Sequence, residues 1–320
     1  MMLHHGNLPV SRKKHSVNSE EYRALIKLKH DTVDTVKRVV VAGIGGSNLG
    51  VKAIAHIFKL PIIFLETYSD THTPRAGDIL VVITKSGSTT ETLHHYAKAD
   101  KYDTVHVITT AGNKLYRHAK KKGYRVSSIP KKVGGRYSVF TNVGSIPLSY
   151  AGFNVAAFMR GAKQMVSMCQ NMHLAAKIAG YSAMDVIDTF VFHKDYETLG
   201  KWNRQLIAES LGKKGKGYLP TVSVGTVDLH SMLQYYLDGK LSIVTQFIRT
   251  PDSHHDTLDA ITQNYSEKQK LWYEVGLDRT PFDTGAYMMF MVHYVLELGN
   301  KLKVNPYNQP AVERYKEIMR

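Results

Sequence analysis

The chain has almost no cysteine: Cys169 is the only one among 320 residues. A single thiol excludes an intramolecular disulfide and is typical of a reducing cytosol, so the sequence predicts a cytoplasmic protein. The residues around Cys169 have the apolar spacing of a helix. This spacing favours a buried thiol over a catalytic nucleophile.

Long hydrophobic runs are absent as well. No apolar run approaches the roughly 18 residues that a membrane span needs, and the opening residues MMLHHGNLPVSRKKHS lack the apolar segment of a signal peptide. The hydrophobic fraction of 43% and the charged fraction of 22% are ordinary for a globular protein. The length predicts about two domains, and we expect no membrane partner.

Acidic residues are few relative to basic ones. There are 42 Lys and Arg against 27 Asp and Glu, which gives a formal net charge of +15. This charge is typical of a protein with a polyanionic partner, of one with a phosphorylated substrate, or simply of a basic proteome. The basic residues are scattered, however, and the sequence has no basic helix, zinc spacing or other nucleic-acid module. We therefore expect no specific nucleic acid, although a nucleic-acid-binding protein with steeply salt-dependent binding stays as an alternative.

Short apolar strands alternate with helices from residue 37 onward. Strands are predicted at 38–42, 62–65, 79–83, 105–108, 221–224 and 243–248, and helices at 153–200, from Asp228, at 285–302 and after Gln309. This rhythm predicts an α/β protein with two doubly wound parallel sheets, each an αβα sandwich. We expect an irregular N-terminal arm at 1–35, a first domain at 36–150, a second at 151–304 and a C-terminal helix at 305–320.

The glycine-rich stretch Gly43–Gly50 follows the first strand and opens a helix. Its backbone amides can approach a ligand closely. It lacks the Lys-Ser/Thr ending of a nucleotide P-loop and departs from the dinucleotide fingerprint. A tight turn and a ligand loop both remain possible here.

A second loop, Thr84–Glu91, follows the strand at 79–83 and contains five hydroxyl side chains, Lys85 and a glycine at a helix start. Hydroxyls, backbone amides and one cation are what a phosphate monoester needs in the absence of a metal. This composition favours a phosphate site over the alternative, an ordinary helix-capping cluster in which Thr89 or Thr90 is the cap.

The stretch 201–217 predicts a helix that ends at Leu211, followed by a loop with three lysines. Gln205 and Glu209 are four residues apart, so they project from one face and can meet the same ligand. A carboxylate beside a cationic loop suits a base that works next to an anionic substrate. The alternative is a surface helix with a solvated glutamate.

Other candidates are single residues. Arg136 lies after two glycines and is either aimed at an anion or part of a surface salt bridge. His230 is predicted in the first turn of a helix, where the dipole favours the neutral ring; the alternative is a structural histidine. Gln309 and Lys316, seven apart, are expected on one face of the last helix. For His254-His255-Asp256 a polar loop is favoured over a metal site, so we expect no metal and no cofactor.

Six segments resemble, in the same order, the glucose-6-phosphate isomerase family, whose members consist of two sugar-isomerase (SIS) domains of flavodoxin-like fold. These are GIGGSNLG at 43–50, TKSGSTTET at 84–92, GGRYSVFTNVGSIPL at 134–148, WNRQLIAESLGKKGKG at 202–217, VGTVDLHSMLQYYLDG at 224–239 and NQPAVERYK at 308–316. The resemblance implies an aldose–ketose isomerase that interconverts glucose 6-phosphate and fructose 6-phosphate without metal or nucleotide.

The resemblance also implies a role for each matching residue. Glu209 would move a proton between C1 and C2 through a cis-enediol, with Arg136 beside the developing charge. His230 and Lys316 would open and close the sugar ring. The phosphate would be bound by Thr84, Lys85, Ser86 and Thr89, and the sugar by Gly46, Ser47, Gln205 and Gln309. In the family the histidine comes from the neighbouring subunit, which implies a homodimer.

Two alternatives remain beside this reading. One is an isomerase that also accepts mannose 6-phosphate, and the other is a non-catalytic regulator that binds sugar phosphates. Gln205 and Gln309 favour the glucose-restricted enzyme, and the four catalytic candidates together argue against a regulator, since a binder needs no base. The chain is shorter than typical family members, and the lost segments lie before residue 36 and between the motifs.

Overall fold

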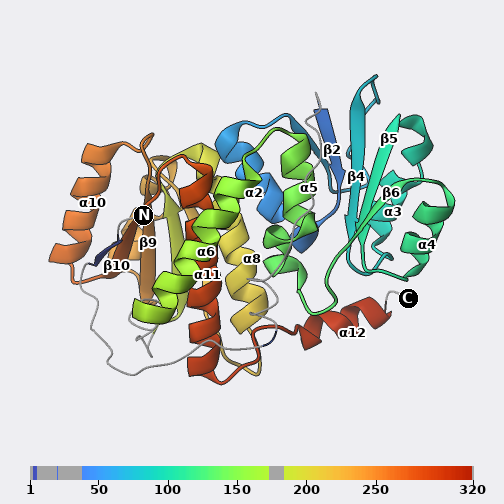
Figure 1. Ribbon diagram of the computed structural model, residues 1–320. Helices are drawn as coiled ribbons and strands as arrows, with labels where there is room; N and C mark the ends of the chain where they lie inside the picture. The colour runs from blue at the N-terminus through green and yellow to red at the C-terminus, as the bar shows by residue number, and fades with distance from the viewer. Residues whose placement is uncertain (1–2, 6–19, 21–37, 173–183, 319–320) are drawn as a thin grey trace. The chain divides into compact units, whose positions relative to one another are not determined.

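The computed structural model describes residues 3–5, 20, 38–172 and 184–318 (Figure 1). The chain forms two compact units: unit 1 consists of Met1–Asn18 and Arg160–Arg320, and unit 2 of Ser19–Met159. The division falls inside helix α6 (Val155–Met172). Most of the arm predicted at 1–35 lies outside the described residues, as does the side chain of Cys169.

Unit 2 contains a five-stranded, fully parallel sheet. Its strands are β2 (Arg38–Ala42), β3 (Ile62–Leu65), β4 (Asp78–Thr84), β5 (Thr104–Thr109) and β6 (Arg125–Ser128). They lie in the order β3-β2-β4-β5-β6, which is the flavodoxin-like arrangement. Every residue of β4 is buried, as expected for a central parallel strand with helices on both faces.

Alternate residues of these strands supply two separate cores. Val41 and Val81 pack with Ile146 of α5 (Asn142–Tyr150), whereas Val40 and Val82 belong to the other cluster. That second cluster includes residues of α3 (Thr90–Tyr96) and α4 (Lys114–Lys121). Helix α2 (Leu49–Phe58) contacts α5. The two-residue period of a strand thus accounts for the helix layer on each face.

Unit 1 repeats this plan with one addition. Strands β7 (Val186–Val191), β8 (Leu219–Val224), β9 (Ile243–Arg249) and β10 (Leu271–Gly276) are parallel, in the order β10-β9-β7-β8. A short strand, β1 (Leu3–His5), pairs antiparallel with β10 at the edge. The predicted α/β class with two doubly wound sheets is confirmed, but the prediction of an irregular arm was wrong for β1, since three residues are too few to show an alternating pattern.

The helices of unit 1 after α6 differ widely in burial. They are α8 (Glu197–Leu211), α9 (Leu233–Asp238), α10 (His255–Glu267), α11 (Pro281–Leu302) and α12 (Pro310–Ile318). Every residue of α11 from Thr284 to Gly299 is buried, and α8 packs against both α11 and β8. Helix α8 is therefore anchored against the buried helix α11.

The sequence prediction was wrong in two places here. Residues 153–200 do not form continuous helix, because β7 runs through the middle of that range and is buried throughout. The polar residues Asp188 and Thr189 in the middle of β7 interrupt the continuous apolar run that identifies a buried strand in the sequence. The helix predicted from Asp228 is instead a 3-10 turn, Val227–Leu229, followed by α9. Strands β6 and β10 and helix α10 were not predicted.

Asp188 is fully buried in the centre of the sheet. Its Oδ1 accepts hydrogen bonds from Thr221 Oγ1 at 2.6 Å, Ser223 Oγ at 3.1 Å and Tyr236 OH at 3.3 Å. Its Oδ2 is buried without a partner. Burial disfavours the ionised form and raises the pKa of Asp188 to about 6.

We expect Asp188→Asn to reduce the dependence of stability on pH. The unfolded chain releases this proton near pH 3.8 and the folded protein only near pH 6, so the native protein loses about 3 kcal/mol of stability from this group as pH rises through that interval. Asparagine does not ionise. Thermal midpoints should be measured for both proteins between pH 4 and 8. The midpoint of the variant minus that of the native protein should therefore increase as pH rises, and this difference should become constant above pH 6.

Asp238→Asn is the control, because it removes an exposed carboxylate from the same unit. A difference in midpoint between Asp188→Asn and the native protein that stays constant across this pH range would contradict the assigned titration.

Candidate active site

The loop at the carboxyl end of β4 is folded around hydroxyl groups. Thr84 is buried, and its Oγ1 lies 2.9 Å from Thr89 Oγ1 and accepts from Gly87 N–H at 3.3 Å. Ser86 Oγ accepts from Ser88 N–H at 3.2 Å. Of the two candidate caps, Thr89 occupies the N-cap position of α3, but its side chain makes no capping hydrogen bond and is directed to Thr84 instead.

Residues at the end of the neighbouring strand β5 hold this loop. Thr109 Oγ1 donates to Thr84 O at 2.6 Å, and Thr110 Oγ1 donates to Lys85 O at 2.8 Å. Gly87, at φ +70°, lies so close to the Asn113 side chain that an added Cβ would be 2.6 Å from Nδ2. The sequence analysis missed these supporting residues, although polar residues directly after a second parallel strand are a signal for them.

Lys85 adds a cation to the loop. Its Nζ donates to Val133 O at 2.8 Å, just before the segment that carries Arg136. Burial, and secondly the charge of Arg136, lower the pKa of Lys85. The second cause places the two cations within electrostatic reach of each other.

Arg136 is held by an unusually close contact between backbones. It lies in the 3-10 segment Gly135–Phe140, which packs against the 3-10 turn Gly45–Ser47. A Cβ on Gly46 would lie 2.5 Å from the Gly135 carbonyl carbon, so only glycine allows this approach. Ser138 Oγ donates to Gly46 O at 3.1 Å across the contact.

The arginine itself is 2% exposed, and its guanidinium lies 5.0 Å from the centre of the Tyr137 ring. A surface salt bridge, the alternative considered from the sequence, therefore does not describe it. Unit 2 thus brings together Gly46, Ser47, the Thr84–Thr89 loop and Arg136. Two cations and several hydroxyl donors suit a phosphorylated ligand.

Unit 1 contains the other predicted residues. On α8, Gln205 Nε2 donates to Glu209 Oε1 at 2.7 Å, which confirms that the two side chains share a face. Gln205 Oε1 is buried without a partner. The opposite face of α8 carries Gly200 and the fully buried Ile207. The carboxylate is therefore oriented by a neighbour on an anchored helix.

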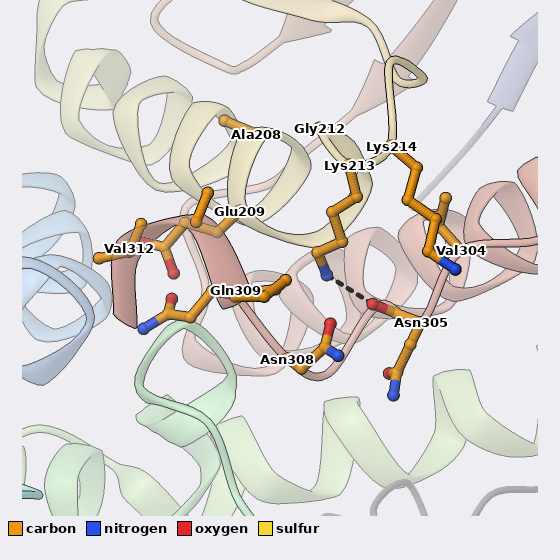
Figure 2. A pocket seen from close by; sticks show the side chains of 12 residues that line it. Ala208, Glu209, Gly212, Lys213, Lys214, Val304, Asn305, Asn308, Gln309 and Val312 are labelled. Atoms are coloured by element: carbon orange, nitrogen blue, oxygen red, sulfur yellow. Dashed lines mark hydrogen bonds between the residues drawn. The ribbon is translucent and has the colours of Figure 1, made fainter. Parts of the chain in front are cut away.

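Glu209 opens into a pocket of about 440 Å³. Figure 2 shows Glu209 and Gln309 directing their polar groups toward the same part of it. The pocket is lined by Ala208, Glu209, Gly212, Lys213, Lys214, Val304, Asn305, Asn308, Gln309, Pro310, Ala311 and Val312. It thus combines one carboxylate with amides, two lysines and a small apolar wall.

The prediction that Gln309 and Lys316 lie on the same helix was wrong. Helix α12 begins at Pro310, so Gln309 lies just before it in the connector from α11. The proline explains the boundary, because proline is favoured in the first turn of a helix. Lys316 lies within α12, but its side chain is outside the described residues.

His230 is exposed and follows the 3-10 turn Val227–Leu229, three residues before α9 begins. The prediction that it lies in the first turn of a helix was wrong, and the argument from the helix dipole does not apply. Asp228 accounts for the local geometry: its Oδ2 accepts from Val224 N–H at 2.7 Å and its Oδ1 from Ser231 Oγ at 2.8 Å.

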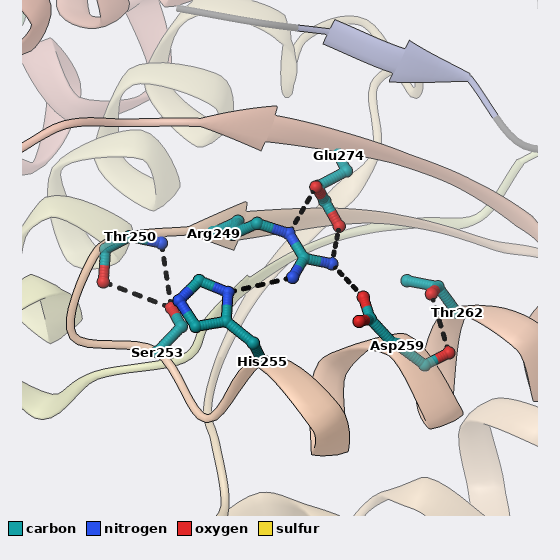
Figure 3. A network of polar contacts seen from close by, with 7 residues as sticks. All are labelled: Arg249, Thr250, Ser253, His255, Asp259, Thr262 and Glu274. Atoms are coloured by element: carbon teal, nitrogen blue, oxygen red, sulfur yellow. Dashed lines mark hydrogen bonds and ion pairs between the residues drawn. The ribbon is translucent and has the colours of Figure 1, made fainter.

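In unit 1 the strand that corresponds to β4 is β9, and the polar groups at its carboxyl end are of a different kind (Figure 3). Arg249, the last residue of β9, donates to both oxygens of Glu274 at 2.7 and 2.8 Å and to Asp259 at 2.5 Å. Its Nη1 lies 3.1 Å from His255 Nδ1. Carboxylates thus neutralise the Arg249 cation.

In the part of the chain that the structure describes, no group of three or more His, Cys, Asp or Glu could hold a metal ion.

Among the described helices, none is both long and apolar enough to cross a membrane.

Two solved structures share the fold. A hypothetical protein from Thermus thermophilus superposes with a TM-score of 0.80 at 26% identity, over 89% of this chain and 83% of that one. A glucose-6-phosphate isomerase from Chlamydia trachomatis gives 0.76 at 19% identity, over 93% and 70%. The predicted sugar-isomerase fold is confirmed.

No family model matches the chain. It is 28% identical to the glucose-6-phosphate isomerase of Staphylococcus saprophyticus, covering 98% of this chain and 85% of the relative. It is 30% identical, over an alignment of 342 positions, to the glucose-6-phosphate isomerase of Methanocaldococcus jannaschii, and the alignment covers 91% of this chain and 85% of that protein. The resemblance inferred from the six segments is thereby confirmed, and the chain belongs to the glucose-6-phosphate isomerase family.

Proposed function

We propose that this protein is a glucose-6-phosphate isomerase, which interconverts glucose 6-phosphate and fructose 6-phosphate by ring opening and proton transfer through a cis-enediol. The observation that carries the proposal is Glu209, oriented by Gln205 at the edge of a pocket that Gln309 also lines. A positioned carboxylate is the group that proton transfer between adjacent carbons requires. The family relationship supplies the substrate.

In this proposal Glu209 takes the proton from C2 of the open-chain aldose and returns it to C1. Arg136 stabilises the negative charge that develops on the enediolate oxygen, a role that suits a buried and permanently charged guanidinium. Gln205 and Gln309 bind sugar hydroxyls, as do Gly46 and Ser47. His230 and Lys316 assist ring opening, by analogy with the family.

The phosphate is assigned to Thr84, Lys85, Ser86 and Thr89. Two features support this assignment: the hydroxyls are already clustered by mutual hydrogen bonds, and the nearby Arg136 makes the Lys85 cation less favourable. A bound dianion would relieve that repulsion, since opposite charges nearby favour the charged form of an amine.

We further propose a cytoplasmic homodimer in which His230 acts in the neighbouring subunit. Exposed apolar side chains flank His230 on both sides: Val227 is 71% exposed, Met232 36% and Tyr235 42%. They follow β8, the edge strand of the unit 1 sheet. An apolar surface beside a sheet edge favours association with another chain. The single cysteine supports the cytoplasmic location.

The first test is a coupled assay of the purified protein, with fructose 6-phosphate as substrate and EDTA present. Glu209→Gln should lower turnover by about a hundredfold or more, because the amide cannot accept the proton, while fructose 6-phosphate still binds. Glu267→Gln is the matched control, since Gln263 Nε2 donates to Glu267 Oε1 at 2.8 Å in the same four-residue spacing on α10.

Normal isomerisation by Glu209→Gln would show that another group is the base. A native protein that binds the sugar phosphate without converting it would be a regulator and not an enzyme. Turnover of mannose 6-phosphate in a parallel reaction would widen the substrate range to the dual isomerase.

Lys85→Ala should act mainly on substrate binding. Loss of the cation should raise KM for fructose 6-phosphate by about tenfold or more, with a smaller change in kcat. Lys101→Ala, which removes an exposed lysine of the same unit, should leave both constants unchanged. An unchanged KM in Lys85→Ala would argue against the assignment of the phosphate to this loop.

Tyr235→Asp should shift the protein toward monomers, because it places a charge in the apolar surface beside His230. Sedimentation velocity over a range of concentrations would measure this shift, and activity per subunit should fall with the dimer fraction. Tyr68→Asp changes an exposed tyrosine of unit 2 and serves as control. A fully active monomer would rule out a histidine supplied by the neighbouring subunit.

A further inference from the structure

The turn after α8 is a two-residue hairpin flanked by Lys213 and Lys216. Lys213 N–H donates to Lys216 O at 3.1 Å, and Lys216 N–H donates to Lys213 O at 2.9 Å. Lys214 and Gly215 between them both have positive φ, 54° and 68°. Two such residues make a type I′ turn. Residues paired directly across a hairpin share one face, so the two flanking lysines point the same way.

Both ammonium groups reach the end of α11 and the segment that follows it. Lys216 Nζ donates to Leu302 O, the carbonyl of the last α11 residue, at 3.0 Å. Lys213 Nζ donates to Asn305 O, a contact visible in Figure 2. Carbonyls in the last turn of a helix lack partners within the helix, and the helix dipole favours a cation there.

The segment so held is the connector 303–309 between α11 and α12, which leads directly to Gln309. Val304 and Pro306 are buried, and Val304 N–H donates to Gly299 O at 3.0 Å. The hairpin begins just after Glu209 and the end of α8, on the same chain segment. It therefore ties the end of α8, which carries Glu209, to the segment that carries Gln309.

We propose that Lys213 and Lys216 are positioning residues, which fix the connector and α12 relative to Glu209 and so keep Gln309 in the pocket. The proposal rests on the isomerase function proposed above. Lys216 gives the cleaner test, because it does not line the pocket, whereas Lys213 does. Any effect of Lys216 on the reaction therefore depends on where it holds the connector.

Lys216→Met removes the ammonium group and keeps a side chain of similar length. We expect kcat to fall roughly tenfold, since small displacements of positioned groups have effects of this order. KM should rise by no more than about threefold, because Gln309 is one of several residues assigned to the sugar and the phosphate loop of unit 2 is untouched. Lys216→Arg, which keeps the charge and the donor, should restore most of the loss. Lys268→Met is the control: this exposed lysine also follows the end of a helix, α10.

Hydrogen–deuterium exchange gives a readout that does not depend on activity. In Lys216→Met, amides of residues 303–312 should exchange faster, while β7 and α8 and the thermal midpoint stay as in the native protein. If either kcat or the exchange of this connector remained at the native value, the proposal would be overturned. Equal effects of Lys216→Arg and Lys216→Met would overturn it too. A native protein without isomerase activity would refute the proposed function instead, and the exchange experiment would still report on the hairpin.

Discussion

The contact between Gly46 and Gly135 is the constraint on which the chemistry of unit 2 depends. With no Cβ on Gly46, two loop backbones meet closely enough to bury Arg136 within electrostatic reach of Lys85. Two like charges near each other are unfavourable, and the fold compensates with a carbonyl for the lysine and an aromatic face for the arginine. The close backbone contact thus brings a lysine and an arginine of unit 2 near each other, and the function proposed above assigns both to an anionic substrate.

The sequence was sufficient where a single local signal decides the structure. The strands at 38–42 and 62–65 were predicted with the observed bounds, because short continuous apolar runs are typical of strands in a parallel sheet. The pairing of Gln205 with Glu209 followed from helical spacing alone. The strand β7 was missed because Asp188 interrupts its apolar pattern, and the hydroxyls that donate to one oxygen of that carboxylate come from β8 and α9, far along the chain.

The positions of single residues at element ends were harder to predict. Whether Gln309 lies on α12 or before it depends on one proline, and the segment around His230 has helical periodicity without forming one continuous helix. The burial of Arg136 could not be predicted either, since it results from a contact between two segments that lie far apart along the chain. Sequence patterns identified the candidates, while tertiary packing decided their environments.

The same strand order occurs in both units, yet corresponding strand ends differ in character. At the end of β4 the polar groups are hydroxyls and a lysine, whereas the end of β9 carries an arginine already engaged by two carboxylates. One topology thus supports a loop of hydroxyls with a lysine in one unit and an arginine paired with carboxylates in the other. The fold alone does not determine the chemistry, which has to be read from the residues at each edge.

The short strand β1 has a consequence for how the protein is made. Its partner β10 ends at Gly276, so the first residues of the chain find their place in the sheet only after most of the chain has been synthesised. Unit 2 is contiguous in sequence and is complete much earlier. Because synthesis runs at about 5–20 residues per second, unit 2 has time to fold before β10 emerges to pair with β1.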